Sequence, residues 1–318
     1  MPSVHLPTKP FDVVAMGEAM VEFNQTRPHE PHYLQGFGGD TSNAVIAASR
    51  AGATTAYLSR LGHDAFGDAL MDLWRTERVD TGAIGRDIHA HTGVYFVTHT
   101  PQGHAFSYLR AGSAASRMDA QWLASPTVQS RIAQAKVLHV SGISLAISHG
   151  ARDTVLAAMR SAKSHATQVS LDSNLRLKLW SVEDARSCLT EAMGLCDVFL
   201  PSLEDIQTLT GMQNPEAIVQ WSHDLGARQV VLKLGADGAL VSDGLHRVHV
   251  PGRRVAAVDA TGAGDCFCGN LLARITQGDS LVDATRYANA AASLAVQGFG
   301  AVAPLPTPAQ VSAVLQCQ

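Results

Sequence analysis

Residues 258–270 read Val-Asp-Ala-Thr-Gly-Ala-Gly-Asp-Cys-Phe-Cys-Gly-Asn, and no other stretch of the chain constrains the predicted structure as strongly. A short β-type run, residues 255–258, leads into two glycines, and an apolar stretch of helical character follows them. Gly262 and Gly264 carry no Cβ, so backbone N–H groups can approach a ligand closely there. The start of a helix adds unpaired N–H donors and a partial positive charge. The stretch therefore predicts an anion site that suits a phosphate group.

Asp265 stands at the edge of this predicted anion site. A carboxylate in that place repels an anionic ligand unless it takes a proton from a nucleophile or holds a metal ion. We therefore interpret Asp265 as a catalytic candidate, and the backbone of Gly262, Ala263 and Gly264 as the anion hole that accompanies it.

Composition narrows the class of protein. The 318 residues are 46% apolar and 16% charged, which is enough for a sizeable core. The 24 basic and 28 acidic residues give a net charge of −4 without a run of like charges, so we expect no nucleic-acid partner. No apolar run reaches roughly 18 residues and the first residues do not resemble a secretory signal, so we expect no membrane span. Five cysteines, an odd number, indicate reduced thiols in a cytoplasmic protein. The spacing Cys266-x-Cys268 does not match a zinc site.

Strand-like and helix-like segments alternate along most of the chain. We expect strands at residues 11–17, 55–61, 137–140, 168–172, 198–200 and 229–234, with helices at residues 41–50, 64–78, 151–163 and 182–193 and from residues 203, 216, 264 and 280. This alternation predicts an α/β fold, in which helices cover both faces of a mostly parallel sheet. The β segments near residues 18–36 and 91–112 interrupt the alternation. We expect them to form a separate small sheet over one edge of the core, with a hairpin turn at residues 100–103.

Gly38, Gly39, Asp40 and Asn43 belong to the run Gly-Gly-Asp-Thr-Ser-Asn at the start of a predicted helix. The glycines permit close backbone approach, and the polar side chains could bind hydroxyl groups of a ligand. In the alternative interpretation, one of the polar residues simply caps the helix.

Two further polar motifs directly follow predicted strands, where α/β sheets bind their ligands. Residues 172–176, Asp-Ser-Asn-Leu-Arg, could converge on a polar ligand or form an Asx turn. Lys233 is followed by Gly235 and Gly238, which could admit a flat ring or phosphates, or could form a tight hairpin turn.

Tyr95, Tyr108 and Arg110 lie in the segments of the predicted small sheet. Arginine holds a carboxylate in two parallel hydrogen bonds, so Arg110 predicts an acidic substrate. The alternative is an exposed arginine on a surface hairpin.

The sequence lacks the motifs that identify several other enzyme classes. It contains no Gly-x-x-x-x-Gly-Lys-Ser/Thr loop, no Gly-x-Ser-x-Gly elbow and no His-Glu-x-x-His pair. Gly262-x-Gly264 superficially matches the first part of the dinucleotide-binding motif, but Phe267 occupies the position of the third glycine. A dinucleotide-binding oxidoreductase is therefore the remote alternative.

The combined motifs resemble the ribokinase-like (PfkB) sugar kinases. The run from Gly38 resembles their first signature, residues 61–67 resemble the next, and residues 259–269 resemble the last, within a likeness that extends from about residue 13 to residue 306. The resemblance implies a three-layer α/β sandwich with a small β-sheet lid, formed as one domain over residues 1–318. It also implies phosphorylation by ATP with Mg²⁺, with room for a monovalent cation, and a homodimer.

Within this family, the chain most resembles the kinases of 2-keto-3-deoxygluconate, a sugar acid; a fructokinase or another sugar kinase of the family is the nearer alternative. Asp265 would then be the general base. The residues that would hold the substrate are Gly38, Gly39, Asp40, Asn43, Tyr95, Tyr108, Arg110 and Arg176. Those on the nucleotide side would be Asn174, Lys233, Gly235, Gly238 and Asn289. Many members carry Asn-x-x-Glu near the metal; here Pro201 replaces the Asn, and Glu204 would contact Mg²⁺ through water.

Overall fold

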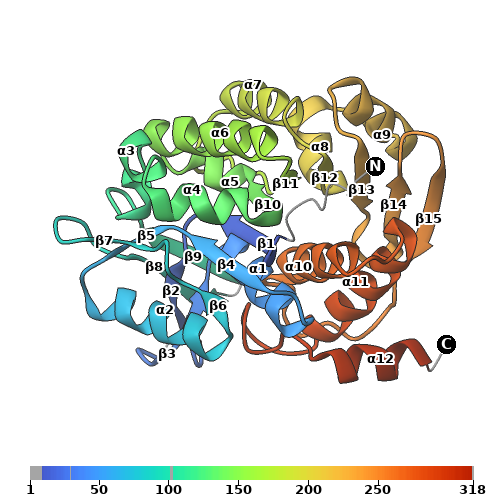
Figure 1. Ribbon diagram of the computed structural model, residues 1–318. Helices are drawn as coiled ribbons and strands as arrows, with labels where there is room; N and C mark the ends of the chain where they lie inside the picture. Colours follow the sequence, from blue (N-terminus) through green and yellow to red (C-terminus); the bar gives the residue numbers. More distant parts are fainter. Residues whose placement is uncertain (1–8, 29, 101–102, 317–318) are drawn as a thin grey trace.

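The computed structural model describes residues 9–28, 30–100 and 103–316. Across these residues, nine strands form a central sheet in the order β15-β14-β13-β12-β11-β10-β1-β4-β6 (Figure 1). The pairs β13–β14 and β14–β15 are antiparallel, and all the other pairs of this sheet are parallel. The mostly parallel sheet is therefore confirmed. The strands are β1 (Phe11–Met16), β4 (Thr55–Leu58), β6 (Val79–Asp80), β10 (Ala135–Ser141), β11 (Gln168–Asp172), β12 (Val198–Leu200), β13 (Gln229–Lys233), β14 (Gly238–Ser242) and β15 (Arg247–Pro251).

Helices cover both faces of this sheet, which gives the three layers that the sequence predicts (Figure 1). Alternate residues of β1 divide between the two cores: Val14 and Met16 pack on one face, and Val13 and Ala15 on the other. The first face carries α3 (Ala120–Leu123), α4 (Pro126–Ala133), α5 (Gly142–Ala146), α6 (His149–Ser164), α7 (Val182–Met193), α8 (Leu203–Thr210) and α9 (Pro215–Asp224). The second carries α1 (Asp40–Arg50), α10 (Ala263–Thr276) and α11 (Leu281–Ala295), with α12 (Pro308–Gln316) packed on α11.

The two β segments that interrupt the alternation form a second sheet, which we call the small sheet. Its order is β3-β2-β8-β9, with β2 (Met20–Gln25), β3 (Tyr33–Gly38), β8 (Gly93–Thr100) and β9 (Gly103–Leu109). Helix α2 (Ala65–Thr76) packs against one face of it, where the rings of Phe23 and Phe66 meet edge to face with centroids 5.8 Å apart. In the expected hairpin turn at residues 100–103, Pro101 and Gln102 lie outside the described residues.

Two strand predictions were wrong. The run at residues 55–61 is two strands, because β4 ends at Leu58 and β5 (Arg60–Gly62) pairs with β7 (Gly85–Asp87) in a separate ribbon. Between β4 and β5, the hydroxyl of Ser59 donates to the carbonyl of Gly17 at 2.7 Å. Residues 255–258 are not a strand, because this run has no sheet partner among the described residues and Val255 and Val258 are exposed.

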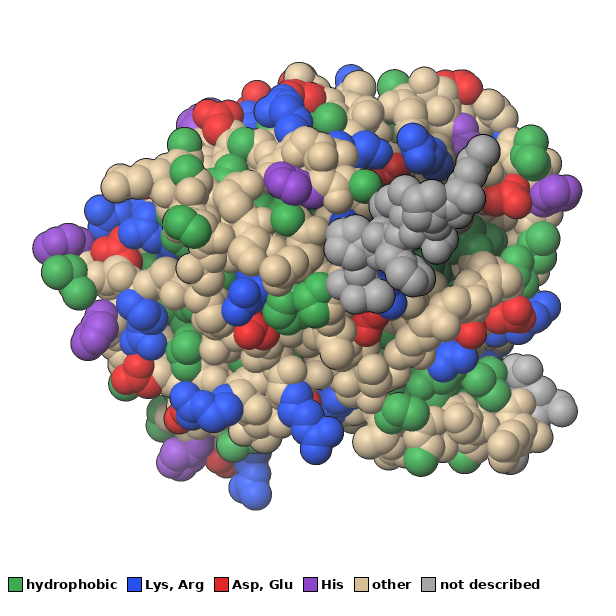
Figure 2. Space-filling view, viewed as in Figure 1, with side chains coloured by type: hydrophobic (Ala, Val, Ile, Leu, Met, Phe, Trp, Pro, Cys, Tyr) green, Lys and Arg blue, Asp and Glu red, His purple; other side chains and the backbone are tan. Residues whose placement is uncertain are grey.

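The surface carries both signs of charge. On the face that Figure 2 shows, Lys and Arg side chains lie interspersed with Asp and Glu. The exposed ion pairs of the described residues include Arg160 with Glu191 and Arg286 with Asp283. In the part of the chain that the structure describes, no helix is both long and apolar enough to cross a membrane.

Candidate active site

The predicted site residues gather at the edge of the central sheet where the parallel strands end. Asp172 is the last residue of β11, and Lys233 is the last residue of β13. Asp40 begins α1, and Asp265 lies in the first turn of α10. Because the carboxyl ends of parallel strands share one edge, residues far apart in the sequence meet there.

Helix α10 begins with an uncapped N-terminus. Gly262 is its N-cap with φ of 74°, and no side chain caps it. A Cβ at this glycine would lie only 3.0 Å from the Cβ of Ala301, so the turn requires glycine for both conformation and space. The first helical hydrogen bond runs from the Cys266 N–H to the Gly262 carbonyl at 2.8 Å. The N–H groups of Gly264 and Asp265 therefore precede the helical ladder, as an anion hole requires. The Ala263 N–H, which was also predicted to belong to the anion hole, instead donates to the Ala260 carbonyl at 3.2 Å.

Asp259 holds the loop before this helix. One oxygen of its carboxylate accepts from the Thr261 N–H at 2.9 Å, and the other accepts from the Gly300 N–H at 2.9 Å. The carboxylate thus joins the start of the glycine turn to the chain that follows α11. This connection gives the anion hole a fixed shape.

Asp265 is paired with Asn43 of α1. Asn43 Nδ2 donates to Asp265 Oδ2 at 2.8 Å, and among the described residues no donor reaches the buried Asn43 Oδ1. Asp265 keeps some contact with solvent, yet burial and the nearby charge of Asp40 raise its pKa to about 7. A carboxylate with a pKa near neutrality can both accept and release a proton under physiological conditions.

Asp40 lies beside this pair and is buried. Its Oδ2 accepts from Asn174 Nδ2 at 2.8 Å, and burial raises the pKa of its carboxyl group. The residue before it, Gly39, is the N-cap of α1 with φ of 112°, and no side chain caps this helix. The interpretation of this motif as a side-chain cap was therefore wrong. Asp40 Oδ1 and Asn43 Oδ1, which no donor among the described residues reaches, remain available to a ligand.

Lys233 and Asp172 form a buried ion pair near Asp265. Lys233 Nζ donates to Asp172 Oδ1 at 2.8 Å. Burial is the largest single influence and disfavours the ammonium group, but the charge of Asp172, its hydrogen bond and the further acidic groups nearby together outweigh burial, so the pKa of Lys233 is raised. The Asn174 N–H also donates to Asp172 Oδ1, at 3.3 Å, which confirms the Asx turn.

The small sheet contributes Tyr95 from β8. The Tyr95 hydroxyl donates to Glu22 of β2, and its ring stacks on Tyr108 of β9 with centroids 5.7 Å apart. A Cβ at Gly38 would lie 2.3 Å from the Tyr95 hydroxyl oxygen. Gly38 is therefore required for Tyr95 to reach this position.

Arg110 is not a free surface arginine. It forms an ion pair with the buried carboxylate of Glu18, which also accepts from the Ser113 hydroxyl at 2.5 Å. The side chain of Arg110 is 12% exposed and that of Glu18 is fully buried. This pair ties the end of β9 to the end of β1.

Sequence reasoning missed Glu18 and Glu22 as candidate site residues. Glu18 directly follows Gly17 at the carboxyl end of β1, and Glu22 lies on β2 opposite Tyr95. Glu18 could have been found from the sequence, because it follows the end of a buried parallel strand, where α/β sheets bind their ligands. For Glu22 there was none, because its role depends on the pairing of β2 with β8.

Several predicted residues lie outside this network of contacts. Arg176 is exposed, with its guanidinium group donating to the Leu175 carbonyl, and Glu204 is exposed in the first turn of α8. Asn289 of α11 donates to the carbonyl groups of β15. Gly235 and Gly238 form the turn between β13 and β14, which confirms the hairpin interpretation.

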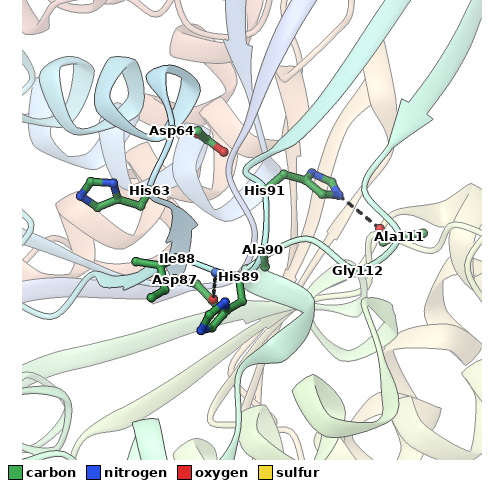
Figure 3. A pocket seen from close by; sticks show the side chains of 9 residues that line it. All are labelled: His63, Asp64, Asp87, Ile88, His89, Ala90, His91, Ala111 and Gly112. Atoms are coloured by element: carbon green, nitrogen blue, oxygen red, sulfur yellow. Dashed lines mark hydrogen bonds between the residues drawn. The ribbon is translucent and has the colours of Figure 1, made fainter.

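A surface hollow of about 410 Å³ lies beside the start of α2 (Figure 3). His63, His89 and His91 line it, and His91 contacts the Ala111 carbonyl at 3.3 Å. Its Asp87 carboxylate accepts from the His89 N–H at 2.8 Å. None of the predicted catalytic residues lines this hollow, so we do not assign it to the reaction.

The chain is similar to known proteins along almost its whole length. The family model for the pfkB family carbohydrate kinases matches residues 10–308. The 2-dehydro-3-deoxygluconokinase of Dickeya dadantii is 32% identical over 307 residues, covering 92% of this chain and 97% of that protein. Fructokinase-1 of Zea mays is also 32% identical, covering 96% and 97%.

A solved structure gives the same result. The crystal structure of fructokinase from Vibrio cholerae O395, with fructose, ADP and calcium ion bound, superposes with a TM-score of 0.85 at 31% identity. The match covers 95% of this chain and 98% of that chain. The same comparisons rule against the alternative hypothesis, in which the glycine turn at residues 262–264 belongs to a dinucleotide-binding oxidoreductase. The chain belongs to the pfkB family of carbohydrate kinases.

Proposed function

We propose that this kinase transfers the γ-phosphoryl group of ATP to the terminal hydroxyl of a sugar acid, 2-keto-3-deoxygluconate. The observation that carries the proposal is the position of Asp265. Its carboxylate is held by Asn43 at 2.8 Å, in the first turn of a helix whose N-terminus no side chain caps. A base and an anion hole thus lie side by side, which is the arrangement that phosphoryl transfer to a hydroxyl needs.

Asp265 accepts the hydroxyl proton as the hydroxyl attacks phosphorus. The N–H groups of Gly264 and Asp265, with the helix dipole, stabilise the charge on the phosphoryl oxygens. Asn43 and Asp40 lie beside the base and hold the sugar hydroxyls. The unpartnered Asn43 Oδ1 supports this role, because a sugar hydroxyl can donate to it.

Arg110 supports the choice of a sugar acid. A guanidinium group has five N–H donors, so the ion pair with Glu18 leaves donors for a substrate carboxylate. Arg176 provides a second cation. Tyr95 and Tyr108 add an aromatic wall. The small sheet then acts as a lid that excludes water and limits hydrolysis of ATP.

The side chains present fit a Mg²⁺ ion that arrives with the nucleotide. Within the described residues, no three His, Cys, Asp or Glu side chains cluster closely enough to hold a metal ion. Mg²⁺ usually keeps several waters and binds through one or two carboxylates and the substrate phosphates. Glu204 is exposed and can contact such an ion through water. When bound, Mg²⁺ neutralises phosphate charge.

On the nucleotide side, we place Lys233 and Asn174 near the phosphates, and Gly235, Gly238 and Asn289 near the adenosine. Dependence on a monovalent cation, a homodimer and a cytoplasmic location remain predictions from the sequence.

A sugar panel tests the proposal. The purified protein is assayed with ATP and Mg²⁺ against 2-keto-3-deoxygluconate, its galactose-series epimer, fructose and ribose, with ADP release coupled to NADH oxidation. We expect the highest kcat/KM for one of the two sugar acids. Faster phosphorylation of fructose would replace the sugar-acid assignment by the fructokinase alternative, which the likeness to Zea mays fructokinase-1 favours.

A further inference from the structure

A buried polar cluster lies where β11, β13 and α10 meet. Lys233 Nζ donates to Asp172 Oδ1 at 2.8 Å and lies 3.7 Å from the Cys268 sulfur. The Cys268 thiol donates to Asp172 Oδ2 at 3.4 Å. The side chains of Asp172 and Lys233 are 5% and 14% exposed. Both oxygens of the carboxylate are therefore occupied, and its orientation is fixed from two directions.

The ammonium group of this cluster lies at the anion hole. A Cβ built on Gly264 would be 3.7 Å from Lys233 Nζ, and this is the nearest described group outside the helix. A phosphoryl oxygen bound at the N–H of Gly264 would meet this ammonium. Lys233 is thus placed to neutralise charge on the group being transferred.

We infer that Asp172 is a positioning residue, which holds the Lys233 ammonium beside Gly264 so that the transferring phosphoryl group meets a fixed positive charge. A lysine side chain is long and flexible, and its ammonium is a point charge without preferred geometry. A buried carboxylate fixed by the Cys268 thiol removes that freedom before the nucleotide binds. The inference rests on the proposed phosphoryl transfer at this site, and it does not depend on which sugar accepts the group.

The surrounding charges agree with this role. The charged and titratable groups that face Lys233 are Asp172 of β11, Asp205 of α8, Cys268 and Asp265 of α10 and His139 of β10. Burial lowers the pKa of His139 to about 4, so His139 adds no second cation at neutral pH. Without the Asp172 carboxylate, the ammonium would be a poorly compensated buried charge, and its side chain would move toward solvent.

The test combines Asp172→Asn with Lys233→Met. We expect Asp172→Asn to lower kcat about 10- to 100-fold, to leave the KM for the sugar within about twofold, and to weaken binding of the Mg²⁺ complex of AMP-PNP about tenfold in calorimetric titration. The double variant should be no slower than Lys233→Met alone, because the carboxylate acts through the lysine. If Asp172 had only a general structural role, the effects of the two substitutions would instead add in free energy.

Asp197→Asn is the matched control. Asp197 precedes β12 at the opposite edge of the sheet, is 8% exposed and binds Lys163 Nζ at 2.6 Å. Its loss should lower stability and leave the kinetic and binding constants unchanged. Wild-type nucleotide affinity and kcat in Asp172→Asn, or losses that multiply in the double variant, would overturn the inference. Absence of turnover with every sugar would instead remove the proposed function, and the AMP-PNP titrations would still decide the inference.

Discussion

The two ends of the candidate active site are built in different ways. The phosphate end consists of backbone N–H groups at the start of α10, with Asp265 in the same turn. The sugar end consists of side-chain pairs that join the small sheet to the core, such as Arg110 with Glu18, and of the pair Tyr95 with Glu22 within that sheet. The backbone N–H groups of the first end come from one continuous stretch of chain, whereas Ser113 and Glu18, which form a hydrogen bond at the second end, lie 95 positions apart.

This difference separates two kinds of variant. A change at the phosphate end should lower turnover for every sugar, because all acceptors share the same phosphoryl group. A change at the sugar end should alter KM or the preference among sugars. A phosphate-end variant that affects only one sugar, or a sugar-end variant that affects all sugars equally, would contradict this distinction between the two ends.

The largest effect is expected for Asp265→Asn. Loss of a positioned general base should lower kcat about 10²- to 10⁴-fold with each sugar that the enzyme accepts. The pKa of Asp265 is about 7 in the folded protein and has the ordinary value of 3.8 in the unfolded chain, so ionisation of this group lowers the free energy of unfolding. The loss grows as the pH rises from 3.8 to about 7 and is complete above that range. The variant should therefore unfold at the same temperature as the wild type or higher at pH 8. Near-normal turnover would remove Asp265 from the role of base.

The pH dependence of kcat/KM of the wild-type enzyme should report the ionisation of Asp265. Because Asp265 acts as a base when ionised, kcat/KM should fall about tenfold for each pH unit below about 7 and level off above about 8. Asp40→Asn removes a charge that raises the pKa of Asp265, so it should move the acid limb to lower pH. The profile is measured with saturating MgATP. An acid limb that stays in place in Asp40→Asn would contradict the assignment.

At the sugar end, Arg110→Met is combined with Glu18→Gln so that no buried carboxylate remains unpaired. Loss of a hydrogen-bonded charge is worth about 1.5–3 kcal/mol, so kcat/KM for a sugar acid should fall about 10- to 100-fold. For fructose it should change less than about threefold. Arg160→Met, at an exposed ion pair on α6, is the control and should change neither value. Equal losses with both sugars would show that Arg110 supports the lid and not the carboxylate.

The smallest effect is expected for Gly38→Ala. The new methyl group would lie 2.3 Å from the Tyr95 hydroxyl oxygen in the present arrangement, so Tyr95 must shift. We expect the KM for the sugar to rise about fivefold, which corresponds to about 1 kcal/mol, with little change in kcat. Gly150→Ala on α6 places its methyl group in ordinary contact, 3.5 Å from the nearest atom, and should leave KM unchanged. Turnover is measured over a range of sugar concentrations for both variants.

The parts of the structure that could be predicted are those that depend on local pattern. The alternation of strands and helices from residue 137 onward, and the start of α10 at its glycine pair, follow from apolar periodicity and glycine spacing. The pairing of Arg110 with Glu18 could not be predicted, because it depends on how the small sheet docks on the core. Residues 255–258 show the same limit: a β-type run forms a strand only where a neighbouring strand offers it hydrogen bonds.

The bond between Asn43 and Asp265 joins residues that are 222 positions apart. During synthesis, Asn43 leaves the ribosome well before Asp265 does, so no nascent fragment that ends before residue 265 can hold the base in place. Long-range contacts of this kind also form late and slowly in folding. Recovery of kinase activity after dilution from denaturant should therefore lag behind the recovery of helical circular dichroism, which makes catalysis a reporter of the completed topology.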